Sequence, residues 1–119
     1  MLFLCHPKCT TCKKAQAWLD DHEIKYEFRD IKENNPNAKE LKKWYALSGV
    51  PLRKFFNTSG RLYRSMELAS KLPEMAESKQ IALLASDGLM VKRPILVDSK
   101  FVLVGFKPAE WRKWFEASS

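Results

Sequence analysis

The sequence predicts an α/β fold in which a mostly helical insert separates a strand–helix–strand unit from a strand–strand–helix unit. An apolar run at Leu2–Leu4 leads directly into an amphipathic segment, and alternating apolar residues follow at positions 24–28. A hairpin pattern over positions 95–104 then precedes a helical stripe. A chain of 119 residues is long enough for one domain with a two-layer core. We therefore expect a single domain over residues 1–119, with the insert at about 36–90.

The first unit is predicted from two kinds of periodicity. Apolar side chains recur at helical spacing over residues 15–22, and Ile24, Tyr26 and Phe28 then alternate with charged residues, as in a half-buried strand. Because a helix connects the two strands, we expect them to be parallel. The loop Asn34–Asn37 ends this unit.

The insert is predicted to be a series of short helices. Leu41 and Trp44 mark the first, which Gly49 ends in a C-cap position. Pro73 closes a later helix, and Ser78 is the expected N-cap of the last one. The strand pattern resumes only after this insert.

The C-terminal unit returns to strands. Ile95–Val97 and Phe101–Val104 flank a short turn, which is typical of a hairpin. Pro108 then occupies the first position of a closing helix whose packing stripe includes Trp111 and Trp114. This order of elements, with a cysteine pair at the first strand–helix junction, is the pattern expected of a thioredoxin-like domain.

Cys9 and Cys12 stand at the start of the first predicted helix, with two residues between them. Unpaired backbone N–H groups and the positive end of the helix dipole stabilise an anion there, and a thiolate is an anion. Lys8 adds positive charge beside Cys9, and Cys12 lies one turn further along, within reach of the Cys9 sulfur. We interpret the pair as a redox site; two small buried apolar residues are the alternative.

A third cysteine, Cys5, adds metal-binding interpretations of this segment, because Cys5, Cys9 and Cys12 together have the spacing C-x3-C-x2-C. That spacing resembles the iron–sulfur signature of radical S-adenosylmethionine enzymes, although the chain is too short for their barrel. Adding His6 makes a candidate zinc set, but closed zinc sites usually draw ligands from two separated pairs. We therefore expect no metal, and we interpret Cys5 as a packing residue.

Arg93 and Pro94 immediately precede the strand that begins at Ile95. An X–Pro bond at a strand start is a candidate cis peptide. The planar guanidinium group of Arg93 is suited to bidentate pairing with an oxyanion. A solvated arginine beside an edge-strand proline is the simpler alternative, but the cysteine pair favours a functional interpretation.

The composition limits the classes of partner. The net charge is +7, but the basic residues are dispersed, so a solvated basic surface is favoured over direct DNA binding. No apolar run approaches membrane-spanning length, and Met1 leads straight into a strand without a signal-peptide core. Three cysteines in such a chain favour thiol chemistry in a reducing compartment. We therefore expect a cytoplasmic protein with no membrane contact.

Four short segments, taken in order, resemble one family. They are the approach His6–Cys9, the helix start Cys9–Ala15, the triplet Arg93–Ile95 and the ending Gly105–Pro108. Together they look like the arsenate reductase (ArsC) family, which also contains the Spx- and MgsR-type regulators. The resemblance covers nearly the whole chain and implies a thioredoxin-like fold with a helical insert.

The resemblance also implies roles for individual residues. Cys9 takes the position of the family's catalytic cysteine, and Arg93 that of its oxyanion-binding arginine before the cis-proline, here Pro94. Cys12 stands where the glutaredoxin-linked reductases have no cysteine, whereas Spx-like members carry Cys-x-x-Cys. Asn57 and Lys107 stand where those reductases have arginines. The candidate substrate-binding residues are Lys8, Thr10, Thr11 and Lys107.

Two function classes follow from this resemblance. As a thiol oxidoreductase, the protein uses Cys9 as the nucleophile and Cys12 as the resolving cysteine to reduce arsenate or a disulfide. It then needs no cofactor beyond an external thiol donor, such as glutathione with glutaredoxin, or thioredoxin. As an Spx-like regulator, it uses the same Cys9–Cys12 disulfide as a sensor and binds RNA polymerase. The reductase-like sequence at Phe55–Gly60 and the short chain end after the Trp111–Phe115 helix favour the enzyme.

Overall fold

The computed structural model of the protein describes residues 1–117, and its centre is a four-stranded sheet. The strand order is β2-β1-β3-β4. β1 pairs in parallel with β2, as predicted from the helical crossover, and antiparallel with β3. β3 and β4 form the expected antiparallel hairpin. The strands are β1 (Leu2–Cys5), β2 (Glu27–Asp30), β3 (Ile95–Val97) and β4 (Val102–Val104).

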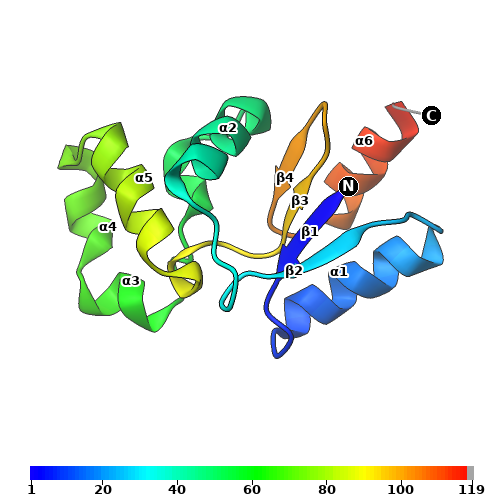
Figure 1. The fold of residues 1–119 in the computed structure, drawn as a ribbon, viewed down its shortest axis with the longest axis horizontal. Helices are drawn as coiled ribbons and strands as arrows, with labels where there is room; N and C mark the ends of the chain where they lie inside the picture. The colour runs from blue at the N-terminus through cyan, green and yellow to red at the C-terminus, as the bar shows by residue number, and fades with distance from the viewer. Residues whose placement is uncertain (118–119) are drawn as a thin grey trace.

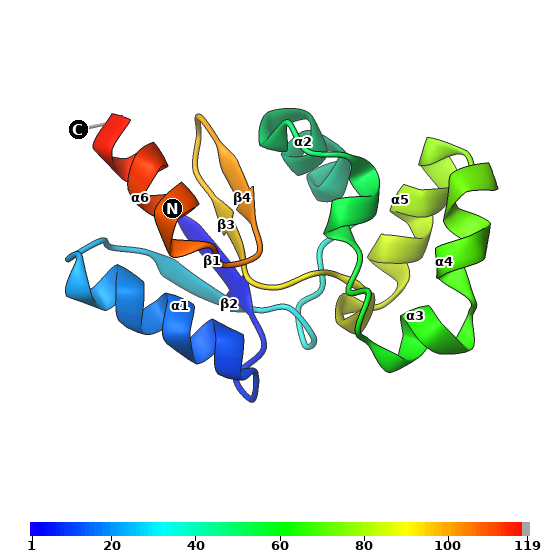
Figure 2. The same cartoon turned by 180° about the vertical axis from the view of Figure 1, so that it is seen from behind.

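Helices cover both faces of this sheet. Figure 1 shows α1 and α6 on one side, and the view from behind in Figure 2 shows α2 to α5 gathered on the other side and toward one end of the long axis. Short 3-10 helices join the elements of the insert at Leu52–Phe55, Leu72–Glu74 and Gly88–Met90. The α-helices are α1 (Thr10–Asp21), α2 (Ala38–Ser48), α3 (Arg61–Ser65), α4 (Leu68–Lys71), α5 (Glu77–Ser86) and α6 (Pro108–Ala117).

Alternation along β1 divides the core into two clusters. Phe3 and Cys5 belong to a cluster with Trp111 of α6 and with apolar residues of α1. Leu4 points to the opposite face and belongs to the cluster formed with the insert, including Leu41 of α2. The sheet is therefore buried on both faces, and the end of β1 lies between the two cores.

Several boundaries of the insert follow the sequence pattern. α2 ends at Gly49, which adopts the left-handed conformation that the predicted C-cap requires, with φ of 69°. At its other end, Asn37 and Glu40 form a reciprocal capping box. The expectation for Ser78 is wrong, because α5 begins after Ala76, whose carbonyl accepts from the amides of residues 79 and 80.

The strand β2 begins later than the alternation predicted. Ile24 lies after the end of α1, and its amide donates to the Leu19 carbonyl of that helix at 3.0 Å rather than to a neighbouring strand. Pairing with the first strand starts only at Glu27, whose amide donates to the Met1 carbonyl at 2.9 Å. Phe28, expected to be half-buried, lies within β2 opposite Phe3 and is 41% exposed on this edge strand.

An ion pair joins β2 to the insert. Both terminal nitrogens of Arg29 donate to the Glu40 carboxylate, at 2.6 and 2.9 Å, and the guanidinium group also lies 5.9 Å from the ring centroid of Trp44. The hydrogen bonds from Arg29 hold the pKa of Glu40 below its ordinary value, against the opposing effect of burial.

Among residues 1–117, no helix is long and apolar enough to cross a membrane.

Candidate functional site

Cys9 is the N-cap of α1, and its backbone is extended, with φ of −86° and ψ of 124°. Its amide donates to the His6 carbonyl at 3.0 Å, which closes the turn after β1, and its carbonyl accepts from Lys13 at 3.1 Å. The thiol makes no capping bond, and the first turn of α1 contains no acidic residue. The positive end of the helix therefore faces the thiol without a neutralising side chain from that turn.

The pairing of the cysteines differs from the expectation. Cys12 forms a disulfide with Cys5, with the two Cα atoms 5.8 Å apart, and Cys9 is a free thiol. The expected Cys9–Cys12 disulfide is thus absent from this structure, and Cys5 is not merely a packing residue. Both bonded cysteines are buried, whereas Cys9 is partly exposed.

The cause of this difference lies in how β1 and α1 bury their cysteines. Cys12 is inside α1 and belongs to the core cluster that also contains Cys5, at the end of β1. Cys9 precedes the helix in an extended conformation and packs against this same cluster as a partly exposed residue. The two cysteines of the motif therefore differ in burial, because Cys12 is enclosed beside Cys5 and Cys9 stays partly exposed at the edge of the cluster.

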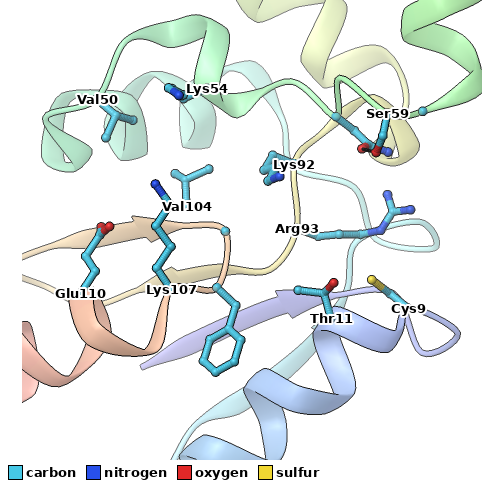
Figure 3. Close-up of a pocket in the computed structure, with 14 residues that line it drawn as sticks. Cys9, Thr11, Val50, Lys54, Ser59, Lys92, Arg93, Val104, Lys107 and Glu110 are labelled. Atoms are coloured by element: carbon cyan, nitrogen blue, oxygen red, sulfur yellow. Dashed lines mark hydrogen bonds between the residues drawn. The ribbon is translucent and has the colours of Figure 1, made fainter.

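Cys9 opens onto a cavity of about 490 Å³ between α1, the insert and the start of α6. Figure 3 shows Cys9 and the Arg93 guanidinium group at one end of this cavity, with Lys54 and Lys107 toward the other. Four cationic side chains line it against one carboxylate, so it is suited to an anion. Its charged and polar lining includes Cys9, Thr11, Lys54, Asn57, Ser59, Lys92, Arg93, Lys107 and Glu110.

Arg93 carries the clearest sign of a missing ligand. Its Nε and Nη1 atoms are buried, and neither has a hydrogen-bond partner. Buried polar groups in proteins are nearly always paired, so such an orphaned pair of donors is typical of a binding site. The Arg93–Pro94 peptide bond is cis, the isomer for which the sequence made it a candidate.

The insert holds the Arg93 segment in place through backbone contacts. The Lys92 amide donates to the Phe55 carbonyl at 2.7 Å, and the Asn57 amide donates to the Met90 carbonyl at 2.8 Å. An antiparallel bridge joins Phe56 and Val91 between these two bonds. Residues more than thirty positions apart along the chain are thereby fixed side by side, which puts Lys54 and Asn57 on the cavity wall.

The turn before α6 is fixed in a similar way. Gly105 has a φ of 79°, a conformation that favours glycine, and its amide donates to the Pro94 carbonyl at 2.8 Å. The indole Nε1 of Trp111 donates to the Gly105 carbonyl at 3.2 Å from within the core. This arrangement joins the residue after Arg93 to the segment that presents Lys107 to the cavity.

The structure brings together four of the predicted site residues around the cavity, namely Cys9, Thr11, Arg93 and Lys107. Lys8, Thr10 and Cys12 do not line it; Lys8 and Thr10 are exposed elsewhere, and Cys12 faces the core. The catalytic and binding roles assigned to these residues stay predictions.

Three charged residues of the cavity were not among the predicted site residues. Lys92 is adjacent to Arg93, and Glu110 lies in the first turn of α6, three positions after Lys107, so both had a local signal. Lys54 reaches the cavity only through the folding of the insert, and no spacing in the sequence indicates it.

The sequence left zinc and an iron–sulfur cluster as alternatives for the cysteines, and both need a set of ligand side chains close together. Among residues 1–117, no group of three or more His, Cys, Asp or Glu side chains is arranged to hold a metal ion. With Cys5 and Cys12 bonded to each other, the C-x3-C-x2-C spacing leaves Cys9 as the free thiol. Zinc or an iron–sulfur cluster would need three or four thiolate or imidazole ligands.

Residues 4–114 match the model of the ArsC family. The chain belongs to the ArsC family. Among curated relatives, the uncharacterised protein YusI of Bacillus subtilis is 45% identical, over 95% of this chain and 96% of its own length. The regulatory protein MgsR of Bacillus subtilis is 29% identical, over 95% of this chain and 88% of its own.

Solved structures of ArsC-related proteins have the same architecture. A putative ArsC family related protein from Bacteroides fragilis is 56% identical, with a TM-score of 0.92 over 94% of each chain. A possible arsenate reductase from Streptococcus mutans is 42% identical, with a TM-score of 0.87 over 96% of this chain and 97% of its own. The predicted thioredoxin-like α/β fold is confirmed.

Proposed function

We propose that this ArsC-family protein is a thiol-dependent reductase in which Cys9 attacks a small anionic substrate held by Arg93. The observation that carries the proposal is that the unpartnered Nε and Nη1 donors of Arg93 lie at the same cavity as the free Cys9 thiol. Leaving buried guanidinium donors unpaired is costly, and an oxyanion or carboxylate satisfies their planar fork.

The chemistry begins at the Cys9 sulfur. Its thiolate attacks an arsenic centre or a disulfide sulfur of the substrate, forms a covalent bond to it, and displaces water or a thiolate. In the protein with Cys12 reduced, the Cys12 thiol then attacks the Cys9 sulfur, so that a Cys9–Cys12 disulfide forms and the substrate leaves with two more electrons. An external thiol donor returns the disulfide to thiols, and we place this cycle in the reducing cytoplasm.

The size of the cavity favours a substrate larger than a bare oxyanion. A volume of about 490 Å³ lies in the range of small-molecule pockets, and Lys54 and Lys107 offer positive charge at the end away from Cys9. A small disulfide that carries carboxylates, such as a mixed disulfide of glutathione, would fill it with one anionic group at Arg93. Arsenate would occupy only the Cys9 end.

A coupled reduction assay tests this function. The fully reduced protein is given arsenate in one arm and a glutathione mixed disulfide in the other, each with glutathione and glutaredoxin or with a thioredoxin system. We expect turnover of at least one substrate, and loss of that turnover in Cys9→Ser. Absence of turnover of both substrates with both donors would overturn the enzymatic proposal.

A regulatory function is the second candidate, and the Cys-x-x-Cys motif favours it. Curated relatives named as the regulatory protein MgsR and as global transcriptional regulators Spx match most of this chain. For the Spx-like class, the partner is RNA polymerase, and the net charge of +7 suits an acidic face on such a partner. An RNA polymerase pull-down, run with oxidised and with reduced protein, separates the two: binding without turnover favours the regulator, and turnover without binding favours the enzyme.

A further inference from the structure

Cys12 lines a second cavity that is separate from the one at Cys9. This second cavity has a volume of about 230 Å³ and shares no lining residue with the cationic cavity. Its lining comes from the turn after β1, the start of α1 and the exposed edge strand β2. We call it the Phe28 groove, and its lining residues are His6, Pro7, Cys12, Lys13, Gln16 and Phe28.

Only one of the two bonded cysteines lines this groove. Cys5 is 0% exposed and does not line it, whereas Cys12 is 4% exposed and does. A thiolate that approaches through this groove meets Cys12 and not Cys5, so we assign the Cys12 sulfur as the atom attacked and Cys5 as the leaving group. In thiol–disulfide exchange the sulfur that is attacked is set by such access.

We propose that Cys5 is a third redox thiol, which takes the disulfide from the Cys9–Cys12 pair, and that a dithiol protein reduces the resulting Cys5–Cys12 disulfide from the Phe28 groove. In the first step the Cys5 thiolate attacks the Cys12 sulfur of a Cys9–Cys12 disulfide. The Cys5–Cys12 bond forms, the Cys9–Cys12 bond breaks, and Cys9 leaves as a thiolate in the cationic cavity. No electrons are gained or lost in this exchange, because one disulfide replaces another.

The second step consumes two electrons from the partner. One thiolate of the partner attacks the Cys12 sulfur, a mixed disulfide forms, and Cys5 leaves and takes up a proton. The second thiol of the partner then attacks its own bonded sulfur, which releases Cys12 as a thiol and leaves the partner oxidised to a disulfide. The oxidant that forms the Cys9–Cys12 disulfide before the first step is the substrate of the proposed reductase, so that part of the inference rests on the proposed function.

The groove is suited to a protein rather than to a small thiol. Phe28 is 41% exposed beside it, and it stands on β2, which is an edge strand of the sheet. A partner that carries an apolar surface around its cysteines buries Phe28 while its thiolate reaches Cys12, and aromatic residues such as phenylalanine are enriched in protein interfaces. The two surfaces also let substrate and reductant bind on different sides of the same motif.

Peptide mapping tests the role of Cys5. Trypsin cleaves after Lys8 and after Lys13, so Cys5 lies on one peptide while Cys9 and Cys12 share another. We expect the full-length protein, oxidised with diamide and digested without reduction, to show the two peptides cross-linked through Cys5 and Cys12. The Cys5→Ala variant should instead show the Cys9–Cys12 peptide closed on itself, with circular dichroism confirming that it is folded. An internal Cys9–Cys12 bond as the end product in the unmodified protein would overturn the proposal.

Reduction kinetics test the docking surface. Protein carrying the Cys5–Cys12 disulfide is reduced with thioredoxin in one arm and with dithiothreitol in the other, and free thiols are trapped and counted over time. We expect Phe28→Ser to slow reduction by thioredoxin roughly tenfold and to leave the rate with dithiothreitol unchanged. Met66→Ser is the matched control, because Met66 is 38% exposed but lies in the distant insert. An equal rate with thioredoxin for Phe28→Ser and the unmodified protein would overturn the docking surface.

The peptide mapping and the reduction kinetics can fail independently of the proposed reductase function. The kinetic experiment starts from protein oxidised with diamide, so it needs no substrate. If no substrate is turned over but thioredoxin reduces the Phe28→Ser variant more slowly, the proposed reductase function is rejected and the Phe28 groove is kept as a docking surface. If Cys5→Ala turns over substrate at the full rate, and both the variant and the unmodified protein end with a Cys9–Cys12 disulfide, the reductase function is kept and the redox role of Cys5 is rejected.

Discussion

The two sides of the first turn of α1 differ in what they offer, although one short motif supplies both. On one side, the free Cys9 thiol lies at a cavity lined by four cationic side chains. One of these is Arg93, whose buried Nε and Nη1 donors have no hydrogen-bond partner. On the other, Cys12 is bonded to Cys5 beside an exposed aromatic ring on an edge strand. The first side is suited to a charged small molecule, and the second to another protein.

The difference shows how a helix start can separate two cysteines only three positions apart. The N-cap residue lies before the helix and stays partly exposed, whereas the residue three positions later lies inside the helix and is buried in the core. A Cys-x-x-Cys spacing therefore does not by itself determine which cysteines are bonded. A third cysteine at the end of the preceding strand is close enough to compete.

The largest effect that would sharpen this contrast is expected from Cys9→Ser. In the protein with the Cys5–Cys12 disulfide, iodoacetamide should label one cysteine, on the tryptic peptide 9–13, and the variant should show no label. Intact-mass spectrometry measures the label, and reduction under denaturing conditions is the control, since it should expose two thiols in the variant. Persistent labelling of Cys9→Ser before reduction would place the reactive thiol elsewhere.

The next largest effect is expected from Arg93→Lys, which tests the cationic side. Lysine cannot reproduce the bidentate fork, so kcat/KM for an anionic substrate should fall roughly tenfold to a hundredfold. Arg53→Lys is the matched control, because Arg53 is exposed in the insert and does not line this cavity. Unchanged kinetics in Arg93→Lys, measured with either substrate, would remove Arg93 from the site.

A smaller effect is expected at the far end of the same cavity. Lys107→Gln should raise KM roughly threefold for a glutathione mixed disulfide, because the lysine is exposed and its charge is screened by salt. KM for arsenate should stay the same, since arsenate occupies only the Cys9 end. Steady-state kinetics at low salt measure both, with Lys100→Gln in the hairpin turn as the control. An equal effect on the two substrates would contradict the proposed length of the substrate.

The smallest effect concerns the frame that both sides share, the Arg29–Glu40 ion pair between β2 and α2. The pKa of Glu40 is lowered in the folded protein, so its contribution to stability is present above the unfolded pKa and is lost as pH falls through the folded pKa. We expect Glu40→Gln to reduce the free energy of unfolding by about 1 kcal/mol at pH 7, and to lose less stability than the unmodified protein on acidification.

Urea unfolding at several pH values measures this contribution. Glu33→Gln, at an exposed position of the loop after β2, is the control and should leave the free energy of unfolding unchanged. An equal dependence on acid in Glu40→Gln and in the unmodified protein would mean that the ion pair does not stabilise the fold.

Local patterns were sufficient for the order of the elements. The helical spacing that begins in α1, the hairpin around residues 98–100, and the caps at Gly49 and Pro108 all have causes within a few residues, so they can be recognised in the sequence. The same holds for the cysteine motif at the first strand–helix junction and for the candidate cis bond before Pro94. The start of β2 was misplaced because alternation continues through residues whose amides bond to α1 instead.

Tertiary packing alone set the two functional surfaces at the Cys9–Cys12 motif. Cys12 pairs with Cys5 because β1 and α1 bury both in one cluster, a proximity that depends on how the helix lies on the sheet. Lys54 reaches the cationic cavity because the insert pairs with the segment before Arg93 across more than thirty residues. Spacing along the chain carries no information on such long-range contacts. The motif therefore predicted thiol chemistry. The fold determined which cysteine stays a free thiol and which cavity Cys9 and Cys12 each line.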